Sequence, residues 1–175
     1  MPKDVVLINR APVLTLWAAV VAERLGFERE EALTLGKALA GLNAQSKGRS
    51  LGIFKPAELA PGEVRKKRGL GEEFFVELCG RGVPAKNTDS GVRAVVLDRP
   101  IDPASVETYL RGKFGDALAR VRDAMTALAK SLTREDLADR AFSLYEQFRP
   151  QIPPGVRGWG AKGELDLARM KSLSR

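Results

Sequence analysis

Basic side chains carry the clearest chemical signal in this sequence. Between residues 47 and 68 the chain has seven lysines and arginines against two glutamates, and the run 65–68 is entirely basic. Ammonium and guanidinium groups on a loop can follow a phosphate backbone without a fixed geometry. The segment therefore predicts a phosphate contact, with a solvated loop that resists aggregation as the alternative. The predicted contact residues here are Lys47, Arg49, Arg65, Lys66, Lys67 and Arg68.

A glycine-rich motif in residues 158–163 combines an aromatic ring with positive charge. Trp159 lies between two glycines, with Arg157 and Lys162 on either side. The letters match a dinucleotide-binding turn, but that turn needs a preceding buried strand, whereas this motif follows a proline-rich exit from a helix. We therefore expect no cofactor fold. The three side chains fit base stacking or phosphate binding, and the alternative is that Trp159 anchors the tail onto the protein's own core.

Histidine is absent from the sequence, and Cys79 is its one cysteine. The chain therefore lacks the side chain that most often acts as a base near neutral pH and the ligand sets that zinc usually takes. Cys79 ends an apolar run, which favours a buried thiol over a reactive thiolate. Residues 80–88 resemble a phosphate-binding loop only superficially and are predicted to form a turn. We expect no catalytic centre, metal site or cofactor, and an enzyme that uses carboxylates is the least favoured class.

Length and charge limit the classes of protein to which this chain can belong. Its 175 residues are enough for one core, and its net charge of +7 favours an anionic partner. A single thiol fits a reducing cytoplasm. Polar residues interrupt the apolar stretch near the N-terminus, so we expect neither a membrane span nor a secretion signal. The chain is therefore predicted to be one cytoplasmic domain without a membrane contact.

Hydrophobic periodicity predicts an α+β fold with an N-terminal αα-hairpin, a small antiparallel sheet and C-terminal helices. Residues 5–8 are predicted to add a third strand to the sheet. Glycines at 112 and 115 predict a break in a helix, and Thr133 begins a capping box. The predicted parts are an αα-hairpin (1–45), a basic connector (46–71), a β-hairpin (72–99), helices (103–149), and a tail with glycines, a tryptophan and a short helix (150–175).

The helix pair near the N-terminus has two possible uses. Residues 20–35 have the outline of a helix-turn-helix, with Gly26 at the turn. Three glutamates begin the second helix, where they would repel phosphate but stabilise the helix dipole, so we interpret the pair as a packed αα-hairpin. The small residues Gly36 and Ala40 would let another element, or a second copy of the chain, approach closely.

Two stretches resemble the bracketing signatures of an uncharacterised family of soluble bacterial proteins. They are the opening NRAPVLTLWAAVVAERLGF and the closing RPQIPPGVRGWGAKGELDLARM, so the resemblance covers nearly the whole chain. It implies that the tail belongs to the domain. It brings with it no activity, cofactor or functional residue.

These observations together predict a non-enzymatic nucleic-acid-associated protein. It would bind the phosphate backbone of DNA or RNA through basic loops, with little base specificity. The alternative is a protein-interaction or regulatory subunit whose basic surface meets an acidic protein. In that alternative, the small-residue face around Gly36 and Ala40 is available for a homodimer.

Overall fold

The computed structural model describes residues 5–46, 73–96, 99–150 and 162–173. Helices and antiparallel strands are both present, with a helix pair first in the chain and more helices after the sheet, which confirms the predicted α+β fold. Across these ranges, no helix combines the length and the hydropathy that crossing a bilayer requires.

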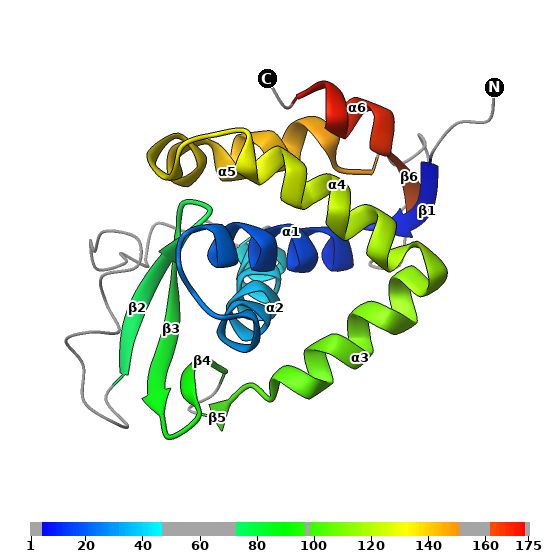
Figure 1. The fold of residues 1–175 in the computed structure, drawn as a ribbon. Coiled ribbons are helices and arrows are strands. Elements are labelled where there is room, and N and C mark those ends of the chain that lie inside the picture. Colours follow the sequence, from blue (N-terminus) through cyan, green and yellow to red (C-terminus); the bar gives the residue numbers. More distant parts are fainter. Residues whose placement is uncertain (1–4, 47–72, 97–98, 151–161, 174–175) are drawn as a thin grey trace.

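The described residues form six α-helices, one 3-10 helix and six strands. The helices are α1 (Arg10–Arg24), α2 (Arg29–Ser46), α3 (Pro103–Phe114), the 3-10 helix η2 (Gly115–Ala117), α4 (Leu118–Lys130), α5 (Arg134–Phe148) and α6 (Leu167–Ser172). The strands are β1 (Val5–Asn9), β2 (Glu73–Leu78), β3 (Arg81–Thr88), β4 (Gly91–Val96), β5 (Arg99–Pro100) and β6 (Lys162–Asp166). In Figure 1, α1 runs through the middle of the molecule, with α2 and the larger sheet on one side and α4 and α5 on the other.

The predicted αα-hairpin is present as α1 and α2. Helix α1 is buried on every face from Pro12 to Ala22, as expected of a helix at the centre of a core. A Cβ on Gly36 of α2 would overlap the Thr15 carbonyl oxygen and lie 3.0 Å from the Ala19 nitrogen of α1. Helix α1 therefore fills the small-residue face, which corrects the expectation that this face is available for self-association. A homodimer through another surface stays a prediction.

The core joins α1 to the C-terminal helices through Trp17. Its side chain is fully buried, and its indole Nε1 donates a hydrogen bond of 2.9 Å to the Ala141 carbonyl of α5. Its ring meets Phe148 edge to face, with 5.2 Å between ring centroids. Such contacts fix the second half of α5 against the middle of α1.

The region predicted as a β-hairpin is a four-stranded antiparallel sheet in the order β2-β3-β4-β5. Residues 80–88, predicted as a turn, are mostly strand β3, so that prediction was wrong. The turn before β3 is short: Cys79 and Gly80 have φ values of 49° and 78°, the left-handed backbone of a two-residue hairpin turn. Pro84 fits in β3 because the ladder to β4 covers only residues 85–88 and stops before the residue that lacks an N–H.

Helix α2 covers the side of β4 that lies away from β3. The Val92 amide donates to Glu31 Oε2 over 2.9 Å, and the Ala94 amide donates to Thr34 Oγ1 over 3.0 Å. The Ala94 carbonyl accepts from the Ile101 amide over 2.8 Å. Side chains of α2 thus accept hydrogen bonds from backbone amides of β4, as the carbonyl groups of a neighbouring strand would. These amides at the edge of β4 are therefore paired.

Strand β1 lies in a second sheet, where it pairs with β6. The register runs antiparallel from Val5 opposite Asp166 to Asn9 opposite Lys162. Residues 5–8 are therefore a strand as predicted, but their place in the larger sheet was wrong. The tail contains a strand before its predicted short helix, because apolar residues of β1 and β6 share one buried face.

Local signals set the ends of the C-terminal helices. Asp102 caps α3, since its Oδ1 accepts from the Ala104 amide over 3.0 Å. The predicted break is confirmed at Gly115, where φ is +56° and η2 separates α3 from α4. The predicted cap is confirmed at Thr133, whose Oγ1 accepts from the Asp136 amide over 3.1 Å.

Candidate functional site

Of the predicted contact residues, the structure describes only Lys162. This lysine is exposed, begins β6 and pairs through its backbone with Asn9 of β1. The remaining predicted contact residues lie outside the described ranges: Lys47, Arg49, Arg65, Lys66, Lys67, Arg68, Arg157 and Trp159.

Arg10, which nothing in the sequence pattern singles out, lies close to both ends of the segment 151–161. It directly follows Asn9, the partner of Lys162, and its Nε donates to the Pro150 carbonyl over 2.9 Å. Residues at the junction of β1 and α1 therefore contact both Pro150, which precedes this segment, and Lys162, which follows it.

Two more arginines contact residues at the C-terminal end of α5. Arg169 Nε donates to the Gln147 carbonyl over 2.6 Å, and the Arg149 guanidinium lies 5.9 Å from the centre of the Tyr145 ring. Carbonyl groups at a helix C-terminus carry partial negative charge, so cations are stabilised there. We define the α5-end cluster as Arg10, Arg149, Lys162 and Arg169.

Two cations of the α5-end cluster, Arg10 and Arg149, lie close together. Burial and the neighbouring Arg149 guanidinium lower the pKa of Arg10, which is the effect expected of two cations held near each other. Among the described residues, no ion pair joins Arg10, Lys162 or Arg169 to a carboxylate. Glu164 shares the outer face of β6 with Lys162 and marks the edge of the cluster. An anion with several oxygens would relieve this repulsion.

The thiol and one phenol of the described residues are poorly suited to catalysis. Burial raises the pKa of Cys79 to about 12, and burial also raises the pKa of Tyr145 to about 12. Both groups are therefore protonated near neutral pH. In the part of the chain that the structure covers, no three histidine, cysteine or carboxylate side chains gather as metal ligands.

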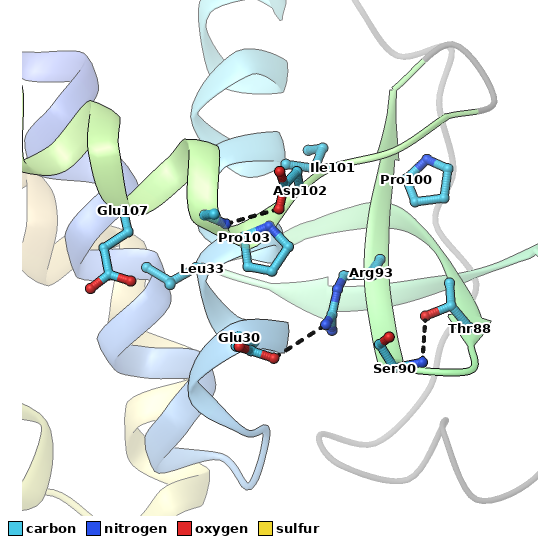
Figure 2. A pocket seen from close by; sticks show the side chains of 11 residues that line it. Glu30, Leu33, Thr88, Ser90, Arg93, Pro100, Ile101, Asp102, Pro103 and Glu107 are labelled. Atoms are coloured by element: carbon cyan, nitrogen blue, oxygen red, sulfur yellow. Dashed lines mark hydrogen bonds and ion pairs between the residues drawn. The ribbon is translucent and has the colours of Figure 1, made fainter.

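A second feature is an open cleft of about 550 Å³ beside β4. Figure 2 shows it between the start of α2, the turn that joins β3 to β4, and the junction of β5 with α3. Arg93 of β4 extends toward Glu30 of α2, with 3.4 Å between Nη2 and Oε1. Although it is charged, Arg93 is only 6% exposed. The alternation of apolar and polar residues along β4 could not predict this site, because it does not show which face of the strand another element covers.

Glu31, next to Glu30, fixes α2 against β4 at this cleft. Its Oε2 accepts from the Val92 amide, and its Oε1 accepts from the Glu28 amide just before the helix, both over 2.9 Å. The interpretation of the first-turn glutamates as partners of the helix dipole is therefore incomplete, since Glu31 is only 5% exposed and joins two elements.

Comparisons with protein-family models, with curated proteins and with solved structures find no match for this chain. No residue role therefore comes from a relative, and the resemblance of the opening and closing stretches stays a prediction. The α5-end cluster and the cleft beside β4 are interpreted from their own geometry.

Proposed function

We propose that this is a non-enzymatic, nucleic-acid-associated protein that contacts the phosphate backbone of DNA or RNA. One observation carries the proposal: arginines from α1, the end of α5 and α6 converge where the chain enters the segment 151–161. That segment holds Arg157 and Trp159, whose side chains suit phosphate binding and base stacking. A cytoplasmic location is part of the proposal.

The hydrogen bonds of the α5-end cluster favour this use. Arg10 and Arg169 each donate through Nε to a backbone carbonyl, which fixes the direction of the side chain. The Nη groups of a guanidinium held in this way can still donate to a phosphate, and Arg forms strong paired hydrogen bonds with phosphate oxygens. Less side-chain entropy is lost on binding when the side chain is already ordered.

The same geometry predicts little base specificity. The cluster gathers cations from α1, α6, β6 and the residue that follows α5, and such separate cations suit phosphate contacts more than base edges. Each phosphate contact releases bound counterions, and binding should weaken steeply as salt is raised. The basic connector would add further contacts of the same kind through Lys47, Arg49 and residues 65–68.

The experiment is fluorescence anisotropy with labelled single-stranded and double-stranded oligonucleotides across a salt series. The site variant combines Arg149→Gln and Lys162→Gln, which keeps the hydrogen bonds of Arg10 and Arg169 to the end of α5. The matched control combines Arg134→Gln and Arg140→Gln, which removes the same charge from exposed positions on α5 away from the cluster. A connector variant changes all four residues of 65–68 to alanine.

We expect salt-sensitive binding that the site variant weakens and the control leaves nearly unchanged. Loss of two phosphate contacts should reduce the slope of log K against log salt by roughly 1.5–2. Equal weakening by the site variant and the control would show that net charge alone matters and would overturn the site. Binding of poly-L-glutamate without binding of either oligonucleotide would overturn the nucleic-acid proposal in favour of an acidic protein partner.

A further inference from the structure

We propose that the cleft beside β4 binds a small zwitterion, with an apolar α-amino acid as the ligand class. Opposite charges line the cleft: Arg93 lies on β4, and Asp102 lies at the start of α3 (Figure 2). Leu33 and Pro100 add apolar surface. An anion without a positive group would face Asp102 and Glu30, and a cation without a negative group would face Arg93. A ligand that carries both charges is the class that both walls stabilise.

Arg93 has hydrogen-bonding capacity left for a carboxylate. Its Nη1 donates to the Val92 carbonyl over 2.9 Å, which holds the guanidinium in place. Its Nη2 lies 3.4 Å from Glu30 Oε1, which is a long contact to a side chain that is 69% exposed. A guanidinium has five N–H groups, and within the described residues only these two contacts engage them. A ligand carboxylate can therefore replace Glu30 at Nη2, and Glu30 is then free to accept from the ligand ammonium.

Ser90 and Asp102 complete the two ends of the site. The Ser90 amide donates to Thr88 Oγ1 over 3.2 Å, and Figure 2 shows the Ser90 side chain on the turn beside Arg93. Because Ser90 lines the cleft, its hydroxyl can donate to a ligand carboxylate. Asp102 uses Oδ1 to accept from the Ala104 amide over 3.0 Å, so Oδ2 can accept from an ammonium. The cleft volume lies within the range of roughly 300–1,000 Å³ that is typical of small-molecule sites.

The test compares three compounds of nearly equal size by amide chemical-shift titration of the full chain. L-leucine carries both charges, L-leucinamide carries only the ammonium, and N-acetyl-L-leucine carries only the carboxylate. We expect L-leucine to shift the amides of Ser90, Arg93 and Ala104. Loss of one charge-assisted hydrogen-bonded end should weaken binding by roughly tenfold to a hundredfold, so each of the other two compounds should bind that much more weakly.

The variant that tests the ammonium end is Asp102→Asn, because asparagine caps a helix about as well as aspartate and the fold is retained. We expect it to weaken binding of L-leucine by roughly tenfold or more. The matched control is Asp166→Asn, which makes the same change at the cap of α6, where Oδ1 accepts from the Ala168 amide over 3.0 Å. Replacing the buried Arg93 would also disturb the packing of β4, so the inference is tested at Asp102.

Three results would overturn the inference. They are the absence of shifts at these amides up to roughly 10 mM L-leucine, equal binding of L-leucine and either analogue, and equal binding by the Asp102→Asn and Asp166→Asn variants. The inference does not depend on the α5-end cluster. The combined Arg149→Gln and Lys162→Gln variant should therefore bind L-leucine normally whether or not it binds nucleic acid.

Discussion

Replacing Thr34 by valine tests whether α2 takes the place of a neighbouring strand along β4. Valine keeps nearly the shape of threonine but removes the oxygen that accepts from the Ala94 amide. Thr34 is fully buried, so water cannot replace the lost acceptor. A buried N–H left without a partner costs roughly 1–3 kcal/mol. The free energy of unfolding should fall by about that amount, and Tm should fall by about 2–4 °C for each kcal/mol in a chain of this length.

Thr15→Val is the matched control, because Thr15 is also fully buried in a helix. Its hydroxyl donates over 2.9 Å to the Ala11 carbonyl of its own helix and accepts no backbone amide in the described structure. Removing it leaves no N–H orphaned, so stability should change by less than about 0.5 kcal/mol. Urea denaturation measures both variants, and hydrogen exchange of the Ala94 amide should accelerate in Thr34→Val alone. Equal stability of the two variants, or unchanged exchange at Ala94, would refute the reasoning.

Two further predictions concern the packing of α1 and the behaviour at high pH. Gly36→Ala should lose roughly 1–3 kcal/mol of unfolding free energy through overlap with α1, whereas Gly41→Ala, with no atom within 4 Å of its Cβ, should gain up to about 1 kcal/mol. Urea midpoints that move in the same direction would contradict this. Burial raises the pKa of Tyr145 from 10.0 to about 12, so the folded state holds the proton more tightly than the unfolded state. The resulting stability is complete below pH 10 and is lost between pH 10 and about 12, at up to roughly 1.4 kcal/mol per pH unit. Tyr145→Phe should show a flatter dependence over this window in urea denaturation, and an identical dependence would disprove the assignment.

Much of the helical architecture could be predicted from the sequence because its signals are local. A capping hydroxyl and the amide that it accepts from are three residues apart at Thr133. The break after α3 needs only Gly115, whose positive φ few other residues adopt. The αα-hairpin follows from apolar periodicity on either side of Gly26. In each case the deciding interaction lies within one or two turns of the chain.

The features that the sequence could not predict depend on contacts between distant residues or on an unusual turn. Strand β3 was missed because Cys79 adopts a left-handed backbone that glycine, asparagine or aspartate usually supplies in such turns. Arg10 and Pro150 are 140 positions apart, and no local pattern brings them together. The buried position of Arg93 depends on elements that pack over β4, not on β4 itself. The predicted basic contacts outside the described ranges stay predictions.

The pairing of β1 with β6 has a consequence for how the chain is made. Val5 emerges from the ribosome about 160 residues before Asp166, its partner in the register. At roughly 5–20 residues per second, β1 waits on the order of 10–30 s for β6. During that time its apolar side chains have no sheet to join, and Leu7 remains 66% exposed even after pairing. Unpaired apolar strands recruit other chains. The yield of this protein should therefore depend on translation speed and on chaperones that cover the first strand as it emerges.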